Sequence, residues 1–157
     1  MPTLYILCGL PGAGKTTLAA AIAKQRDVAH VSLAHIKADE GYFVSDAEVP
    51  DADWSGIYDV IHASLLMPLR LGRDAIYDAT NLKREQRDDL RALAASRNFA
   101  ARVIYVEVPE VTVRERWHGT PGAIDAAIEG FEEPSKDEDV IVYAPTLDVT
   151  RWIKANF

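Results

Sequence analysis

Short apolar runs alternate along this chain with longer stretches in which the apolar residues have helical spacing. The apolar runs, each typical of a buried strand, are residues 4–8, 30–33, 75–77, 102–108 and 140–143. The stretches with helical spacing are residues 15–26, 54–69, 84–97, 111–117, 123–131 and 147–155. This alternation predicts an α/β fold, in which a parallel sheet of about five strands carries helices on both faces.

Three places interrupt the alternation. Residues 34–53 contain few apolar positions and are expected to be irregular or partly helical. Pro68 should kink or end its helix, because proline lacks an amide hydrogen and clashes with the preceding turn. Gly119 and Pro121 separate the two short helices. In folds of this kind ligands bind at the carboxyl ends of the strands, so the segments after the first three strands are the first candidates for a site.

Length and composition fit one ordinary globular domain, which we expect to span residues 1–157. The chain is 48% apolar and 26% charged, which excludes a largely disordered protein. A net charge of −7 disfavours a protein that coats nucleic acid. We expect a cytoplasmic protein, because the first residues form neither a signal peptide nor a membrane span and the chain has a single cysteine, Cys8.

Residues 9–16 carry a specific motif, Gly-Leu-Pro-Gly-Ala-Gly-Lys-Thr, which matches the phosphate-binding pattern G-x-x-x-x-G-K-[ST]. The glycines let the backbone curl so that amide hydrogens point at phosphate oxygens, and the following helix adds its positive N-terminal dipole. Lys15 suits the β- and γ-phosphates, Thr16 suits a magnesium ion and Thr17 can reach the α-phosphate. The expected ATP-binding residues are Gly9, Leu10, Pro11, Gly12, Ala13, Gly14, Lys15, Thr16 and Thr17.

A second motif follows the third strand. Asp78 ends an apolar run, and a carboxylate at this place in a nucleotide-binding fold holds magnesium or a water bound to it. Thr80 and Asn81 either cap the next helix or contact a substrate. Cys8, beneath the glycine-rich turn, is expected to be a small buried hydrophobic residue.

Together these motifs resemble a group of P-loop kinases that includes polynucleotide 5′-kinases, zeta-toxin-like kinases and small AAA-type ATP-binding proteins. The resemblance rests on residues 9–17, on Asp-Ala-Thr-Asn-Leu at 78–82 followed by Arg87, and on Phe-Glu-Glu-Pro at 131–134 followed by Glu138. It implies a three-layer αβα P-loop NTPase fold. It also implies magnesium-dependent transfer of the γ-phosphate of ATP to a hydroxyl group of a small molecule, a nucleoside or a nucleic-acid 5′ end.

The resemblance assigns roles to individual residues. Lys15, Asp78 and Arg116 would be catalytic, and Thr16 and Asp78 would hold Mg²⁺, partly through water. Arg116 would act from a lid over about residues 114–134 and stabilise charge on the transferred group. Arg114 competes for this role, and the adenine would lie near Arg116 and the Pro145–Thr146 turn.

The acceptor side departs from the family pattern. After the second strand the family usually has Ser-x-Asp-x-Ile-Arg, whose aspartate activates the acceptor hydroxyl, whereas residues 32–37 read Ser-Leu-Ala-His-Ile-Lys. Ala34 therefore replaces the expected base, which would slow transfer by roughly 10²–10⁴-fold. The possible replacements are His35, Asp39, Glu40 and Asp78. The acceptor-side candidates are His35, Lys37, Asn81 and Arg87, the last of which would face the site or support Asp78.

Charge along the chain leaves the acceptor class open. Residues 34–60 carry a net charge of −6, which favours a small molecule or a short end over duplex DNA, whereas residues 83–102 carry +3 and argue the other way. His62 is expected to be a core histidine. Because of Ala34, two alternatives to a kinase stay open, namely an ATP-binding regulatory module with weak transferase activity and an NTPase switch.

Overall fold

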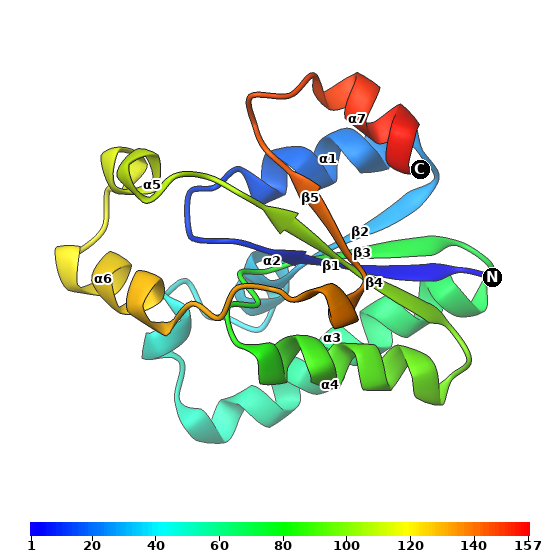
Figure 1. Ribbon diagram of the computed structural model, residues 1–157. Coiled ribbons are helices and arrows are strands. Elements are labelled where there is room, and N and C mark those ends of the chain that lie inside the picture. The colour runs from blue at the N-terminus through cyan, green and yellow to red at the C-terminus, as the bar shows by residue number, and fades with distance from the viewer.

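One parallel sheet runs through the centre of the molecule in the computed structural model, which describes residues 1–157 (Figure 1). Its strand order is β2-β3-β1-β4-β5, and every neighbouring pair is parallel. The strands are β1 (Thr3–Cys8), β2 (Val28–Ser32), β3 (Asp74–Asp78), β4 (Ala100–Val106) and β5 (Val140–Tyr143). Since all strands run the same way, the loops at their carboxyl ends gather at one edge of the sheet.

Helices cover both faces of the sheet, with α1 and α7 on one side and α3 and α4 on the other (Figure 1). This is the predicted three-layer αβα arrangement of a P-loop NTPase, and none of the helices is both long and apolar enough to cross a lipid bilayer. The helices are α1 (Lys15–Gln25), α2 (Leu33–Asp39), α3 (Trp54–Arg70), α4 (Arg84–Ser96), α5 (Glu110–Arg116), α6 (Pro121–Gly130) and α7 (Val149–Asn156).

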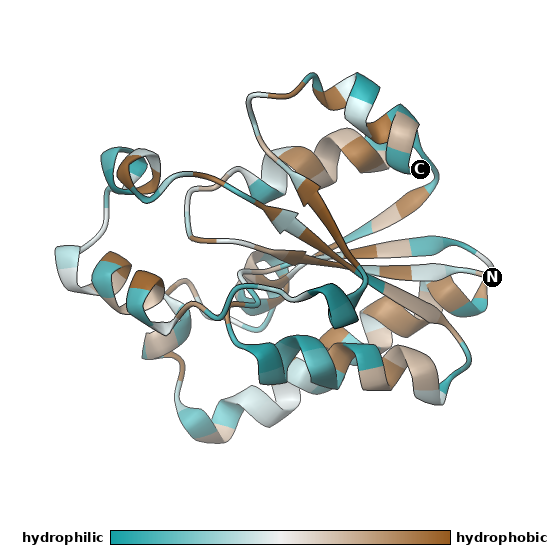
Figure 2. Cartoon of the chain, in the orientation of Figure 1, coloured by the Kyte–Doolittle hydropathy of each residue, from teal (hydrophilic) through white to brown (hydrophobic).

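Two hydrophobic cores hold the layers together, because successive strand residues point to opposite faces. In β1, Leu4, Ile6 and Cys8 pack towards α3 and α4, whereas Tyr5 and Leu7 pack towards α1 and α7. The sheet is accordingly the most hydrophobic part of the molecule, while the first turns of α4 are strongly hydrophilic (Figure 2). The central strand is buried on both faces, which explains its uninterrupted apolar sequence.

The predicted elements are all present, with differences at their ends. Strand β2 begins two residues earlier than expected, at Val28. It also ends one residue earlier, at Ser32, because Leu33 already belongs to α2 and packs in the core. Strand β4 ends at Val106 instead of continuing to residue 108, since Pro109 already begins the turn into α5. Residues 34–53 are partly helical, as expected, and form most of α2 and two short 3₁₀ turns, at Asp46–Glu48 and Asp51–Asp53. Pro68 lies in the last turn of α3, so the helix ends just after it.

Candidate nucleotide and acceptor site

The loop between β1 and α1 has the backbone conformation that the glycine-rich motif predicts. Gly12 and Gly14 have φ values of +79° and +96°, a region that residues with side chains rarely adopt. Gly9 is required for a different reason, since a Cβ atom there would lie 2.9 Å from the carbonyl oxygen of Val106. Helix α1 begins immediately after Gly14, so its free amide groups face the space that the loop encloses.

Lys15 is buried in this loop. Its Nζ atom donates a hydrogen bond to the carbonyl oxygen of Leu10 at 2.8 Å, and only 8% of the residue is exposed. Burial lowers the pKa of the ammonium to about 8, against the opposing attraction of Asp78. The charge is therefore held inside the turn of the loop, where a phosphate group would meet little competing water.

Asp78 joins the loop to β3. Its Oδ2 atom accepts a hydrogen bond from Oγ1 of Thr16 at 2.8 Å, and the same oxygen lies 3.0 Å from Nε2 of His30. Burial alone would raise the pKa of the Asp78 carboxyl, but the contacts with His30 and Thr16 outweigh burial and hold it below its usual value. Oδ1 makes no hydrogen bond within the protein, and because no buried side-chain oxygen lacks a partner, Oδ1 is reached by solvent.

His30 is a site residue that the sequence analysis missed. It lies in β2, opposite Ile76 of β3, and points to the same face of the sheet as Asp78. No spacing in the sequence relates residues 30 and 78, since only the pairing of the two strands brings them together. The one available signal was a histidine in the middle of a short, mainly apolar strand.

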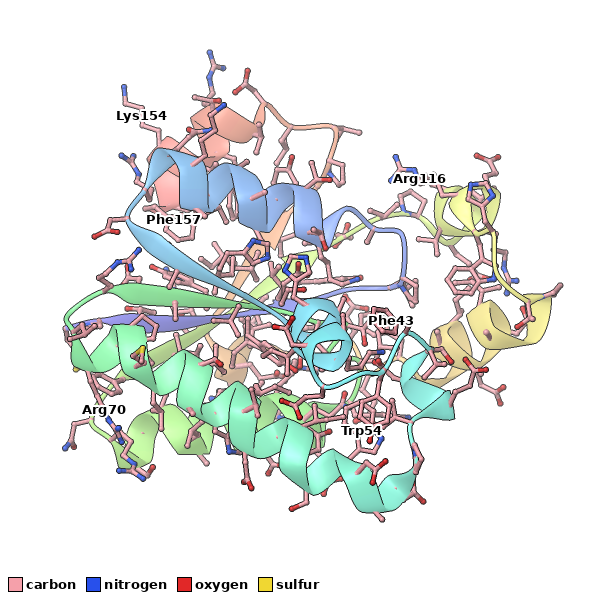
Figure 3. The ribbon with its side chains drawn as sticks, turned by 180° about the vertical axis from the view of Figure 1, so that it is seen from behind. Phe43, Trp54, Arg70, Arg116, Lys154 and Phe157 are labelled. Carbon is pink, nitrogen blue, oxygen red and sulfur yellow. The ribbon has the colours of Figure 1, made fainter.

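Of the two lid arginines, Arg116 is the one that reaches the phosphate loop. Its Nη1 atom donates to the carbonyl oxygen of Gly12 at 3.3 Å. Arg114 instead binds Glu110 at 3.0 Å and Asp125 at 2.6 Å, which connects α5 to α6. Figure 3 shows Arg116 at the end of the molecule opposite Lys154 and Phe157. The geometry therefore favours Arg116 over Arg114 for a role at the phosphates.

A small cavity of about 300 Å³ lies beside the loop, between the start of α1 and the turn after β5. Its lining brings Arg116 and Pro145 together, as expected for an adenine site, and adds Tyr143. The apolar side of the cavity comes from Leu18 and Val149. An aromatic and aliphatic lining of this kind suits a flat heterocycle.

A larger cavity of about 650 Å³ lies on the other face of the sheet, between α3 and α4. Its rim is formed by Thr80 and Asn81, in the loop that follows Asp78. The backbone amide of Gly9 donates to the carbonyl oxygen of Thr80 at 3.1 Å, so this rim touches the first residue of the phosphate loop. The cavity and the phosphate loop are thus neighbours at the carboxyl edge of the sheet.

Arg87 does not line this cavity, so of the two roles that the resemblance left open its contacts favour support of the segment around Asp78 over an acceptor contact. Its side chain is fully buried and forms a double hydrogen bond with Glu138, at 2.6 and 3.1 Å. A further nitrogen donates to the carbonyl oxygens of Asn81 and Leu82. Arg87 therefore supports the loop after β3 from behind and is not positioned to contact an acceptor.

The side chain of Asn81 also has a structural role. Its backbone has a φ of 46°, and its Nδ2 atom donates to the carbonyl oxygen of Leu7 at 2.6 Å, which fixes the loop after β3 against β1. Cys8, beside it, is fully buried, and burial raises the pKa of its thiol to about 11, as expected for an unreactive core residue.

The remaining acceptor-side candidates lie apart from one another. Lys37 is buried in an ion pair with Asp46 at 2.5 Å, whereas His35 is exposed on α2 and does not line the larger cavity. His62 was expected in the core, but it is only partly buried and lines this cavity. It points outwards because Ile61 and Leu65 take the positions on α3 that face the sheet.

The donor set fits magnesium better than a transition metal. No group of three or more His, Cys, Asp or Glu side chains is placed to hold a metal ion. Thr16 and Asp78 instead place a hydroxyl and a carboxylate together beside the phosphate loop. Magnesium is usually held by one or two such oxygens together with nucleotide phosphates and water.

Comparisons with known proteins agree with this architecture. A gluconokinase from Sinorhizobium meliloti 1021 is 19% identical with a TM-score of 0.70, over 98% of this chain and 88% of that one. The Mycobacterium tuberculosis APS kinase CysC, in complex with AMPPNP and APS, is 16% identical with a TM-score of 0.70, over 99% and 95% of the two chains. A chain of the Pnkp1/Rnl/Hen1 complex is 23% identical with a TM-score of 0.67, over 76% of this chain but only 40% of that one.

These likenesses establish the fold. No curated protein sequence matches the chain. A sequence family described as an AAA domain matches residues 4–129, which include the phosphate loop, Asp78, Arg116 and most of α6. Since this match covers most of the sequence, the chain belongs to that AAA domain family of P-loop proteins.

Proposed function

We propose that this protein is a magnesium-dependent kinase that transfers the γ-phosphate of ATP to a hydroxyl group of an acceptor. The observation that carries the proposal is the hydrogen bond between the Gly9 amide and the Thr80 carbonyl. It connects the loop suited to phosphate with the rim of a 650 Å³ cavity suited to a second substrate. A protein that only bound or hydrolysed ATP would need no such cavity beside the γ-phosphate position.

In this proposal the loop amides and Lys15 hold the β- and γ-phosphates. Lys15 is already buried among the groups that would meet them, and desolvation makes its charge act more strongly on an anion. The adenine occupies the 300 Å³ cavity next to Arg116. Arg116, which contacts the loop at Gly12, stabilises the negative charge that spreads over the transferred group.

Thr16 and Asp78 are the residues that would hold Mg²⁺, directly or through water. When bound, the ion neutralises charge on the phosphate oxygens. The low pKa of Asp78 keeps its carboxyl ionised at neutral pH, as a cation ligand must be. His30 fixes the orientation of that carboxylate from the neighbouring strand.

The transfer forms one bond to the γ-phosphorus and breaks one. An oxygen of the acceptor hydroxyl forms a new bond to the γ-phosphorus, the bond from that phosphorus to the bridging oxygen of ADP breaks, and the hydroxyl proton is released. Oδ1 of Asp78 makes no hydrogen bond within the protein and is not completely buried, so it can accept a hydrogen bond from the hydroxyl. Neither Asp78 nor His35 lines the larger cavity, but Asp78 directly precedes two of its lining residues, Ala79 and Thr80. Asp78 is therefore our candidate for the group that orients the acceptor in place of the base missing at Ala34.

The test is transfer of ³²P from γ-labelled ATP with magnesium to a panel of nucleosides, sugars and 5′-hydroxyl oligonucleotides. We expect a labelled product that disappears in Lys15→Ala, with a loss of about 10²–10³-fold, because one essential charge contact is removed. Lys24→Ala is the matched control, since Lys24 is an exposed lysine on the same helix. Full activity in Lys15→Ala would contradict the assignment of the loop.

One observation favours the regulatory alternative, namely the alanine at position 34, where the family usually has its base. The same assay separates the alternatives. Tight ATP binding without any labelled acceptor or free phosphate would support an ATP-sensing module. Release of free phosphate alone would support an NTPase switch.

A further inference from the structure

The wall of the larger cavity that α3 contributes is a stripe of rings. Trp54, Tyr58 and His62 follow one another at intervals of four residues, so they lie on one face of the helix. Their ring centroids are 5.5 Å apart for Trp54 and Tyr58, and 6.3 Å apart for Tyr58 and His62. Such a stripe offers flat surfaces for the ring of a ligand.

The floor of the cavity is apolar and comes from the sheet and the helices beside it. Leu33, Ile61, Tyr77 and Leu90 are all less than a tenth exposed and form its deepest part. A ligand that filled this space would bury a hydrophobic body, and its polar groups would have to stay near the rim at Thr80 or near the mouth.

The charges at the mouth are negative. Neither lysine nor arginine lines the cavity, and its only fully charged side chains are Asp46 and Asp89. Lys37 offsets part of the charge of Asp46 through their ion pair. Asp89 has no ion pair and no side-chain hydrogen bond, so its charge is uncompensated.

The two carboxylates act on the interior of the cavity. Partial burial raises the pKa of Tyr58, and the negative charges of Asp46 and Asp89 raise it further. The pKa of Tyr77 is raised as well, mainly by burial and also by Asp46. An anionic ligand in the cavity would be repelled by the same carboxylates that disfavour ionisation of these tyrosines.

We propose that the acceptor of this kinase is a neutral or cationic alcohol with a ring, and that Asp89 excludes acceptors that already carry a phosphate or carboxylate. The inference rests on the proposed function, which it narrows to a substrate class. It is carried by the apolar floor, the ring stripe of α3 and the uncompensated carboxylate at the mouth. A cationic acceptor would gain both from Asp89 and from the faces of Trp54 and Tyr58.

The test compares acceptors that offer the same hydroxyl group and differ mainly in charge. A suitable set is 3′-O-methylthymidine, 3′-amino-3′-deoxythymidine and thymidine 3′-monophosphate, each of which offers only its 5′-hydroxyl. We expect phosphoryl transfer to the neutral and cationic members, with kcat/KM at least about tenfold above that of the anionic partner. Preferred phosphoryl transfer to the anionic member would overturn this inference but would still support the proposed kinase activity. Label on none of a broad panel would instead overturn the proposed function.

Asp89→Asn tests the residue itself. Removing one unit of charge at the mouth should lower the preference for neutral over anionic acceptors by about fivefold, and the KM for ATP should stay unchanged. Asp59→Asn is the matched control, because Asp59 is an exposed acid on α3 that does not line the cavity. An unchanged preference in Asp89→Asn, or an equal change in Asp59→Asn, would refute the assigned role.

Binding can be followed without transfer through the fluorescence of Trp54. We expect the neutral and cationic probes to change the emission of the wild-type protein at lower concentration than their anionic partners, and expect Trp54→Phe to lose the signal. The other two tryptophans, Trp117 and Trp152, do not line the cavity. Tighter binding of the anionic probes, or binding by none of them, would contradict the inference.

Discussion

Lys15 is a cation buried in the phosphate loop, and burial disfavours its charged form. Its ammonium is buried beside one carbonyl oxygen, and its pKa falls from the usual 10.5 to about 8. Without nucleotide, the unfolded chain therefore binds a proton more readily than the folded protein between about pH 8 and 10.5. Stability consequently rises with pH in that window, and the protein at neutral pH holds a charge that a phosphate would stabilise.

This leads to a prediction for ATP binding. Nucleotide phosphates favour the charged ammonium, so binding above the pKa of free Lys15 requires uptake of a proton. We expect the Kd for Mg·ATP to rise about fivefold between pH 8 and pH 9, measured by calorimetry. Lys15→Arg should remove this dependence, because a guanidinium does not titrate in that range. A wild-type Kd that stays constant from pH 7 to 9 would contradict the prediction.

Ala34 provides a second test at the residue scale. It is the second residue of α2, and Ser32, two residues before it, pairs in register with Asp78. If the acceptor pocket is otherwise complete, Ala34→Asp should raise kcat about tenfold or more by supplying a base. Ala38→Asp, one turn further along the same helix, is the control. No increase would show that another group, for which Asp78 is our candidate, already performs this role.

The sequence predicted the phosphate side of the site better than the acceptor side, for a physical reason. Phosphate binding uses consecutive backbone amides, so a continuous motif encodes it. The contact between His30 and Asp78, by contrast, depends on the register of β2 and β3. Arg87 was a candidate for the acceptor side, and its place in the motif could not reveal which face of α4 it occupies.

At the scale of elements, the ion pair between Arg87 and Glu138 links α4 to the segment before β5. Both side chains are fully buried, and Arg87 also binds the loop after β3. Arg84 of α4 pairs with the Asp137 carboxylate and Arg102 of β4 pairs with Asp139, while Arg91 donates to the backbone carbonyl oxygen of Asp137. The positive stretch at 83–102 is therefore largely neutralised by residues 137–139, a compensation that a count along the sequence does not show.

Breaking the buried pair should destabilise the whole fold. Glu138→Gln leaves the Arg87 charge buried without its partner, at an expected cost of about 3–5 kcal/mol in the free energy of unfolding. Urea unfolding measures it. Asp139→Asn is the control, because it breaks the exposed pair with Arg102 and should cost less than about 1 kcal/mol. Equal losses in the two variants would show that the buried pair has no special structural role.

At the scale of the whole molecule, the parallel sheet decides where chemistry can occur. The phosphate loop, Asp78 and the lid come from distant parts of the chain, and they meet because every strand ends at the same edge (Figure 1). The alternation of elements predicted this meeting point. It did not predict the two cavities, whose shapes depend on side chains from several elements.

The lid connects this arrangement to catalysis and gives the last prediction. Helix α5 carries Arg116 to the phosphate loop, whereas Arg114 of the same helix makes only exposed ion pairs, with Glu110 and with Asp125 of α6. Arg116→Ala should lower kcat about 10²–10³-fold and change the KM of ATP much less, because the arginine acts mainly on charge that develops during transfer. Arg114→Ala removes only exposed ion pairs and should keep kcat within about threefold. Steady-state kinetics of the two variants test this prediction. A larger loss of kcat in Arg114→Ala than in Arg116→Ala would mean that Arg114 reaches the phosphates when the lid closes.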